Sequence, residues 1–461
     1  MWQSGGRLQS RWVWLGIGCC FLLVGGGVIA FTKIDLEHYR SDAERLQKLA
    51  ATELPTVNGT PIQSANWPQW RGPNHDGLSL ETGLLKDWPS GGPRLVWKQP
   101  IGRGFSSMAV VNGRLYTMDA ETIEEGSGGT APGHYESVVC LDANTGQEVW
   151  RFRYANQYDE RFGSGPRSTP AVDGDFVYAV GPTGILHCVR AATGEKVWRH
   201  DLAEEFQARK MQYGVSFSPL VEGDLVYTTP GGPNGNAVAA FDKRTGRLVW
   251  KALDDVMGYS SPIAVTAAGV RQVLVFTNTA LVSLAPEEGR LLWRYPWETD
   301  NGFNIATPLA FGDYVFLSSG YGKGCVLLEI TPEADGSPRP HRVYEHNRMR
   351  NHFCSSIRQG DYVYGFDQMD LVCMNVRGGE IVWREKGLRS FRKGSVALAD
   401  GRLFVLGESG TLALADATPS GYREKASVRV SENKCWTAPI VAEGKIFVRD
   451  ESQIVCLNLK E

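Results

Sequence analysis

The stretch that decides the fold is Cys140-Leu-Asp142-Ala-Asn-Thr145-Gly146-Gln-Glu-Val-Trp150, and it returns as Ala240-Phe-Asp242-Lys-Arg-Thr245-Gly246-Arg-Leu-Val-Trp250. In both copies Asp and Thr side chains can hydrogen-bond to the backbone of a turn. The Gly that follows can adopt positive φ without steric cost. The remaining residues lead back into a strand that ends on Trp. The stretch therefore predicts a β-hairpin whose last strand carries a large ring toward the neighbouring unit.

Looser copies share one spacing, in which Gly stands four residues before Trp: Gly194 with Trp198, Gly289 with Trp293, and Gly379 with Trp383. A second motif precedes each hairpin, as in Ser168-Thr-Pro170-Ala-Val-Asp-Gly174-Asp-Phe-Val-Tyr178, and reads as strand, Gly turn, strand. The two motifs together predict four short antiparallel strands in a unit of roughly 40–50 residues, which is typical of a propeller blade.

The number of blades follows from the positions equivalent to Trp, which are Trp97, Trp150, Trp198, Trp250, Trp293, Tyr344, Trp383 and a site near Ala426. The last unit, 438–459, contains only three strands, and the isolated strand Arg94-Leu-Val-Trp97 supplies the fourth. We therefore predict an all-β, eight-bladed propeller over 94–461, closed by its N-terminal strand. Seven blades is the alternative, because the units around 329–344 and 412–430 are degenerate.

The N-terminal part predicts export or anchoring. Residues 12–32 are read as a transmembrane anchor, because the run from Trp12 to Phe31 carries no charge and has the length that a membrane-spanning helix needs. Arg7 and Arg11 place residues 1–11 in the cytoplasm and the propeller in the periplasm, on the inner membrane. Residues 33–65 are read as a stalk helix and linker, and 66–93 as a Trp-rich lead-in. The alternative is a cleaved signal peptide with a site near Ala30.

The Asp-x-x-Thr-Gly-x-x-x-Trp repeat resembles that of the quinoprotein (PQQ-like) propellers, which include quinoprotein alcohol dehydrogenases and BamB-type outer-membrane assembly factors. The resemblance covers the chain from Arg94 onward and implies eight blades. The segment Asn66-Trp-Pro-Gln-Trp70-Arg71-Gly72-Pro73 resembles the motif that precedes the propeller in exported bacterial proteins of this kind. Because the Trp repeat is structural in both families, the resemblance does not choose between enzyme and scaffold.

The dehydrogenase side of the resemblance implies a PQQ site with a vicinal disulfide, a Trp, a Ca²⁺ and an Asp base. The adjacent cysteines of this chain are Cys19 and Cys20, inside the predicted anchor. PQQ is therefore not expected, and no metal ligands or catalytic residues are predicted. Cys140, Cys188, Cys373 and Cys456 fall at equivalent strand positions and are predicted to be buried thiols. The net charge of −3 gives no indication of nucleic-acid binding.

One candidate site follows from the repeat, because residues just before each innermost strand should line the mouth of the central channel. They are Phe105, Arg167, Tyr213 to Ser216, Tyr259, Asn304, His352 to Cys354, Arg392, Lys393, and Lys434 to Trp436. The leading hypothesis is a non-catalytic, membrane-anchored scaffold that binds other envelope proteins. The alternative is a PQQ-dependent dehydrogenase, or a sensor of a quinone or another small ligand, that uses the channel.

Overall fold

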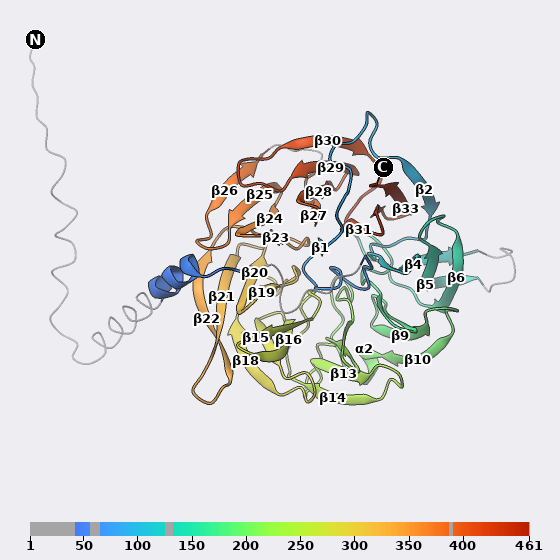
Figure 1. Cartoon of the computed structure of the whole chain (residues 1–461). Coiled ribbons are helices and arrows are strands. Elements are labelled where there is room, and N and C mark those ends of the chain that lie inside the picture. The colour runs from blue at the N-terminus through green and yellow to red at the C-terminus, as the bar shows by residue number, and fades with distance from the viewer. Residues whose placement is uncertain (1–41, 56–64, 125–131, 387–390, 461) are drawn as a thin grey trace, which may run out of the picture. The chain divides into compact units, whose positions relative to one another are not determined.

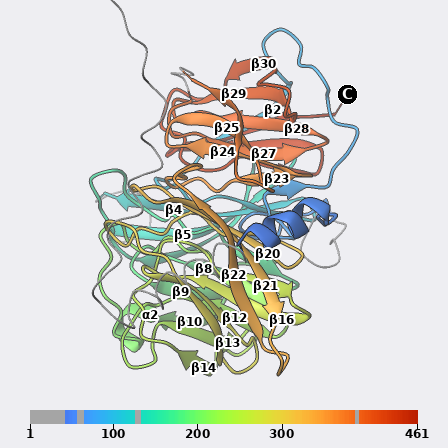
Figure 2. The ribbon, with the colours of Figure 1, turned by 90° about the vertical axis from the view of Figure 1, so that its left-hand side faces the viewer.

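The propeller has eight blades arranged around a central axis, as Figure 1 shows. The structure is a computed structural model that describes residues 42–55, 65–124, 132–386 and 391–460. The prediction of an all-β eight-bladed propeller is confirmed, and the seven-bladed alternative is wrong. Figure 2 shows the same blades from the side.

The first four blades each consist of four consecutive antiparallel strands. Blade 1 contains β3 (Ala109–Val111), β4 (Arg114–Ile123), β5 (Gly133–Asp142) and β6 (Glu148–Ala155). Blade 2 contains β7 (Ala171–Asp173), β8 (Phe176–Val180), β9 (Ile185–Arg190) and β10 (Lys196–Asp201), followed by the short helix α2 (Leu202–Glu205). Blade 3 contains β11 (Leu220–Glu222), β12 (Leu225–Thr228), β13 (Val238–Asp242) and β14 (Leu248–Ala252). Blade 4 contains β15 (Ile263–Ala267), β16 (Val270–Phe276), β17 (Ala280–Leu284) and β18 (Leu291–Pro296).

The other four blades include the two that depart from this plan. Blade 5 contains β19 (Leu309–Phe311), β20 (Tyr314–Ser319), β21 (Gly324–Pro332) and β22 (Pro338–His346). Blade 6 contains β23 (Ile357–Gln359), β24 (Tyr362–Asp367), β25 (Asp370–Asn375) and β26 (Ile381–Glu385). Blade 7 contains β27 (Ser395–Ala399), β28 (Arg402–Leu406), β29 (Thr411–Asp416) and β30 (Glu424–Arg429), and β1 (Leu78–Ser79) adds to β27 in parallel. Blade 8 contains β31 (Ile440–Ala442), β32 (Lys445–Arg449), β33 (Gln453–Asn458) and β2 (Leu95–Pro100).

The repeat motif forms the predicted hairpin. In blade 1 the Asp142 carboxylate accepts hydrogen bonds from the backbone N–H groups of Asn144 and Thr145, both at 3.0 Å, and Asp242 does the same in blade 3. The cysteines of the motif face the Trp of the next strand, in the pairs Cys140–Trp150, Cys188–Trp198, Cys373–Trp383 and Cys456–Trp97. All four are free and buried, as predicted.

Every Trp of the repeat except Trp293 contacts the turn of the following blade. A Cβ added to Gly146 would lie 2.7 Å from the Trp97 ring, and the same close approach joins Gly194 to Trp150 and Gly246 to Trp198. The Trp97 indole also donates a hydrogen bond to the carbonyl oxygen of Ala143 at 3.1 Å. Glycine is required here because a side chain would occupy the space of the ring. The motif therefore holds adjacent blades together, which explains why Gly and Trp recur with one spacing.

The seam between blades 4 and 5 is different. The Trp293 indole donates to Gln272 Oε1 in its own blade at 2.7 Å, because blade 5 replaces the tight Gly turn with the long hairpin β21–β22. At the next seam Tyr344 takes the position of Trp, as predicted, and its hydroxyl donates to the carbonyl oxygen of Val376 at 2.7 Å.

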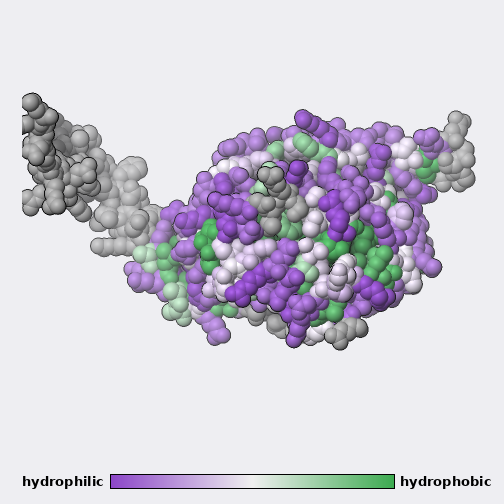
Figure 3. Space-filling model, turned by 90° about the horizontal axis from the view of Figure 1, so that it is seen from above, coloured by the Kyte–Doolittle hydropathy of each residue, from purple (hydrophilic) through white to green (hydrophobic). Residues whose placement is uncertain are grey.

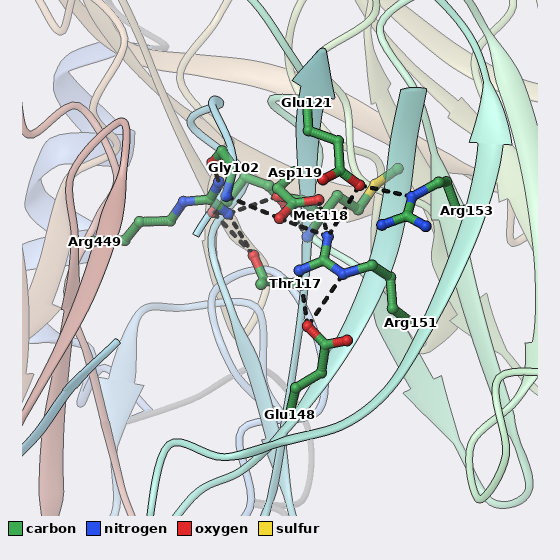
Figure 4. Close-up of polar contacts among 10 residues, drawn as sticks. Gly102, Thr117, Met118, Asp119, Glu121, Glu148, Arg151, Arg153 and Arg449 are labelled. Carbon is green, nitrogen blue, oxygen red and sulfur yellow. Dashed lines mark hydrogen bonds and ion pairs between the residues drawn. The ribbon is translucent and has the colours of Figure 1, made fainter. Parts of the chain in front are cut away.

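The ring closes where β2 pairs with β33, so the N-terminal strand completes the last blade as predicted. A buried Arg449 in β32 connects blade 8 to blade 1 at the same seam. Its Nη1 donates to the carbonyl oxygens of Ser106 and Met118 and to the Thr117 hydroxyl at 2.6 to 2.9 Å (Figure 4). Joining the two ends of the chain removes the open sheet edges that a linear array would leave.

The lead-in segment, 66–93, crosses the centre of the propeller. Trp67 pairs with Val110 of blade 1, and the Trp70 indole donates to the Thr307 hydroxyl beside blade 5 at 2.8 Å. Its strand β1 then joins blade 7, near the middle of the view in Figure 1. Blades 1 and 5 lie on opposite sides of an eight-membered ring, so the segment must run across the channel.

The outer rim carries isolated apolar side chains. Leu95, Val149, Leu291 and Val382, on the outermost strands, have 40 to 53% of their surface exposed. The rim seen in Figure 3 is mostly hydrophilic, with small separate hydrophobic areas. Single exposed apolar residues are ordinary on soluble surfaces, so the rim itself does not indicate a binding site.

The N-terminal part is described only in fragments. A helix spans 42–51, within the predicted stalk. The predicted anchor at 12–32 lies outside the described residues. Among the residues that are described, no helix is long and apolar enough to cross a membrane.

Candidate functional site

One face of the propeller carries a circuit of aromatic side chains, which we call the mouth ring. Its members come from loops that lead into the innermost strands, with one from the β20–β21 loop. The mouth ring consists of Phe105, Phe162, Tyr213, Tyr259, Phe303, Tyr321, His352, Phe353 and Trp436. Seven of the eight loops that connect one blade to the next contribute a member, so the ring extends around almost the whole circumference.

Neighbouring rings are in contact around the circuit. The centroid distances are 6.0 Å for Phe162–Tyr213, 5.5 Å for Tyr213–Phe303, 5.2 Å for Phe303–Tyr321, 4.9 Å for Tyr321–His352, 5.4 Å for His352–Phe353, 5.3 Å for Phe353–Trp436 and 5.3 Å for Trp436–Phe105. Phe105 in turn packs on Gly163, next to Phe162, where an added Cβ would lie 2.3 Å from its ring. Aromatic pairs at these spacings stabilise one another and fix their orientation.

Cations lie against this circuit. Lys434 Nζ is 4.3 Å from the centre of the Trp436 ring, and Arg161 lies 5.3 Å from that of Phe162. Lys393 Nζ is 3.3 Å from His352 Nε2. Cation–π contacts of this kind are attractive and leave the outer side of the cation available to an anion. The mouth therefore combines apolar ring faces with positive charge.

Three of the titratable rings stay neutral at physiological pH. Burial, together with the charge of Lys393, lowers the pKa of His352 to about 4. Burial raises the pKa of Tyr259 and of Tyr321 to about 12. Because an ammonium group can only donate, His352 accepts at Nε2 and carries its proton on Nδ1. These rings contribute no charge to the mouth, and the buried Tyr259 also contributes little surface.

The sequence-predicted site residues divide into two groups. Phe105, Tyr213, Tyr259, His352 and Trp436 all belong to the mouth ring, and Lys393 contacts it through His352. Arg167 instead holds its own loop, and Asn304 joins its loop to the β16–β17 turn. Arg167 donates to the carbonyl oxygens of Gly163 and Gly165 at 2.6 and 2.9 Å. Asn304 is fully buried and donates to backbone carbonyls such as that of Thr277, at 2.8 Å.

Three members of the ring were not singled out from the sequence: Phe162, Phe303 and Tyr321. Phe162 and Phe303 lie within five residues of the predicted Arg167 and one residue of the predicted Asn304, in the same junctions. A search of each whole junction for aromatic residues would have found both. Tyr321 lies in a loop inside blade 5 and has a positive φ of 52°, so only the folded chain brings it to the mouth.

The lead-in segment forms the base beneath the mouth ring. A cavity of about 30 Å³ separates them, and it is lined from below by Trp67, Trp70 and Arg71 and from the mouth side by Phe353 and Trp436. This volume holds one or two water molecules. Arg71 is fixed there by hydrogen bonds from its Nη2 to the carbonyl oxygens of Ser356 and Asp76, at 2.6 and 2.7 Å. The mouth is therefore a surface over a filled channel.

The loop that carries Phe105 is fixed by charges. The carboxylate of the buried Asp119 accepts from Arg151 Nη1 at 2.8 and 2.9 Å and from the backbone N–H of Gly102 at 2.9 Å. Arg449 approaches the same loop from the other side, as Figure 4 shows. Burial lowers the pKa of Arg449 to about 10, so it remains charged at neutral pH. Asp119, Arg151 and Arg449 therefore hold the loop that carries Phe105 and are not available for catalysis.

The residues present do not fit a PQQ site of the kind that the resemblance implies. The seven cysteines of the described chain are free, buried and non-adjacent. Within the same residues, no three His, Cys, Asp or Glu side chains are grouped to hold a metal ion. The cavity beneath the ring is also far below the roughly 300 Å³ at which small-molecule pockets begin. Neither the metal-ligating side chains of the described residues nor the volume of this cavity fits PQQ and its Ca²⁺.

The fold and the mouth define the class: an eight-bladed propeller built on the quinoprotein-type Trp repeat, with an aromatic surface at one end of a filled channel. The family described as outer membrane protein assembly factor BamB matches residues 134–368 and 367–460. The chain therefore belongs to this family. No curated protein matches the sequence.

Solved structures of different functions share the fold. BamB from Moraxella catarrhalis aligns with a TM-score of 0.57 and 13% identity, over 79% of this chain and 99% of that one. Quinohemoprotein alcohol dehydrogenase from Comamonas testosteroni gives 0.58 and 12%, over 92% of this chain and 84% of that one. The computationally designed Ika8 protein gives 0.53 and 12%, over 79% of this chain and 100% of that one. At such identities these likenesses concern architecture alone.

Proposed function

We propose that the protein is a non-catalytic scaffold that binds a partner protein through the mouth ring. The observation that carries the proposal is the combination of a nearly continuous circuit of nine aromatic rings, all but Phe105 and Tyr259 at least partly exposed, with a channel already filled by the lead-in segment. Aromatic residues on a rigid framework are the usual centres of protein interfaces. A small substrate would need an enclosed pocket, which the cavity beneath the ring does not provide.

Site-specific photo-crosslinking in intact cells tests this proposal. Phe162 in the mouth ring and Val382 on the outer rim each have 42% of their surface exposed, so they form a matched pair. We expect a photoreactive phenylalanine analogue at position 162 to form a discrete adduct with an envelope protein identified by mass spectrometry, and the analogue at position 382 to form none. Equal labelling at both positions would contradict the choice of surface.

The competing function is a PQQ-dependent dehydrogenase, or a sensor of a small ligand, in the channel. It is tested by titrating the protein with PQQ and Ca²⁺ and following quinone fluorescence and dye-linked alcohol oxidation. We expect no saturable binding. Saturable binding accompanied by oxidation would overturn the scaffold proposal directly.

We further infer that the propeller is held outside the cytoplasm by residues 12–32, on the inner membrane. The support is the uncharged run between Trp12 and Phe31 that follows Arg7 and Arg11. Alkaline extraction of membranes and protease treatment of spheroplasts test it. We expect the full-length chain to stay in the membrane fraction with its propeller accessible to protease. Release of a shortened chain would support the cleaved signal peptide instead.

A further inference from the structure

One arc of the mouth ring differs from the rest in carrying two unpaired lysines, and we call it the cationic wall. It consists of Lys393, His352, Phe353, Trp436 and Lys434. Lys393 donates to His352 Nε2 at 3.3 Å, the rings of His352, Phe353 and Trp436 follow at 5.4 and 5.3 Å, and Lys434 lies 4.3 Å from the Trp436 ring. Two cations thus flank three consecutive aromatic rings.

The two lysines have no acidic partner. Among the described residues, neither Lys393 nor Lys434 forms an ion pair, and Lys434 Nζ donates to the carbonyl oxygen of Phe162 at 2.9 Å. Both side chains are half-buried, so part of their hydration is already lost. An anion that approaches them meets ammonium groups with unused hydrogen-bond capacity.

The nearby carboxylates are already engaged. Glu408 Oε1 accepts the indole N–H of Trp436 at 2.8 Å, which fixes the orientation of that ring. Glu160 lies 3.6 Å from Arg167. Because His352 is neutral, the wall presents Lys393 and Lys434 as its cations, with Glu408 holding the ring between them. The indole N–H does not neutralise Glu408, so two ammonium groups against one carboxylate leave the wall with a net positive charge toward a ligand, and the wall is ordered before a ligand arrives.

The form of the wall favours an extended chain. Phe353 and Trp436 rest on the lead-in segment across a cavity of about 30 Å³, so a ligand lies on their faces and does not enter the channel. A peptide with carboxylate and aromatic side chains can satisfy the lysines while its rings stack on the wall. We propose that the cationic wall binds a segment of the partner protein in which acidic residues adjoin aromatic ones. This inference rests on the proposed scaffold function.

The chain offers a matched control for the lysines. Lys323 also lies over a Trp ring, with Nζ 4.4 Å from the centre of Trp297, but a carboxylate oxygen of Glu345 is 3.2 Å away. Substitution of Lys323 by Gln therefore removes a stacked lysine whose charge is already neutralised. Any change in peptide affinity caused by this substitution therefore reflects the net charge of the protein and not the cationic wall.

The binding test uses the full-length protein and a fluorescein-labelled peptide, Gly-Asp-Trp-Glu-Phe-Asp-Gly, followed by fluorescence anisotropy. We expect saturable binding that weakens with added salt, and about tenfold weaker binding after Lys393→Gln or Lys434→Gln, as is typical of losing one charge-assisted contact. Lys323→Gln should leave the affinity within about twofold, the range of a surface ion pair. Thermal unfolding of each variant verifies that the fold is retained.

Two matched peptides separate the contributions. Asn and Gln in place of the acids should abolish the salt dependence and most of the affinity, and Leu in place of the two rings should weaken binding without changing the salt dependence. The inference is overturned if the acidic peptide fails to bind, if the amide peptide binds equally well, or if the variants at Lys393 and Lys434 behave like that at Lys323.

The crosslink from position 162 separates this inference from the proposed function. If the adduct forms in wild type and persists undiminished in the Lys393→Gln Lys434→Gln double variant, the scaffold function stands and the acidic-aromatic segment is wrong. If no adduct forms and PQQ binds saturably, the scaffold function fails as well.

Discussion

The contact between Gly289 and Trp250 allows the blade seam to be tested quantitatively. Gly289 has a φ of +69°, and a Cβ added there would lie 2.4 Å from Trp250 Cε3. The ring is buried and its indole N–H donates to the carbonyl oxygen of Pro286 at 2.8 Å, so it cannot turn away without losing a hydrogen bond. Gly269, in the other turn of the same blade, has a φ of +72° and open space around it.

The expected losses in the free energy of unfolding follow from the surroundings of these two glycines. Gly269→Ala should cost about 1 to 2 kcal/mol, because it incurs only the strain of a left-handed L-residue. Gly289→Ala incurs the same strain and also the overpacking of the Trp250 ring, which adds about 1 to 3 kcal/mol. The total for Gly289→Ala is therefore about 2 to 5 kcal/mol. The difference between the variants isolates the seam contact from the backbone conformation.

Urea unfolding of the full-length protein, followed by Trp fluorescence, measures both losses. Trp250→Leu and the double variant complete a cycle in which the Gly289→Ala penalty should shrink once the ring is gone. Equal destabilisation by Gly289→Ala and Gly269→Ala would refute the reasoning, because it would mean that the Trp ring relaxes freely at the seam.

Three further predictions concern buried polar groups. Arg449→Met should destabilise the protein by about 3 to 5 kcal/mol in urea unfolding, because it leaves Asp119 without that nearby charge and several carbonyls without a donor; a loss below 1 kcal/mol would contradict this. Arg71→Met removes the donor to Ser356 and Asp76 and should speed limited proteolysis within 66–93, while cleavage elsewhere stays unchanged. Burial lowers the pKa of His187 to about 3, so on acidification the unfolded chain binds this proton at a higher pH than the folded chain does. The contribution of the neutral His187 to the free energy of unfolding is complete above about pH 6.5 and is lost as the pH falls toward 3, with about 2 kcal/mol lost by pH 5. His187→Gln should flatten the fall in urea midpoint between pH 7 and pH 5, and an unchanged slope would exclude this assignment.

Much of the fold was predictable from the sequence because the decisive interactions are local. The turn that contains Asp142 and Gly146 forms from residues within one hairpin, so its spacing repeats wherever the hairpin does. Counting these hairpins gave eight units, and the strand from Arg94 to Trp97 gave the closure. The path of the lead-in segment across the channel had no such signal, because its partners Val110 and Thr307 are distant in the sequence.

The sequence alone determined the blade, its number of copies and the junctions from which a site could be built, since strand alternation and turn chemistry act over a few residues. Only the tertiary structure decided which junction residues face the mouth. It turned the Asn304 side chain onto the carbonyl oxygen of Thr277 in the β16–β17 turn and brought Tyr321 from within blade 5 beside His352. The reason is physical: the direction of a loop side chain depends on the neighbours available to satisfy it, and those neighbours come from other blades.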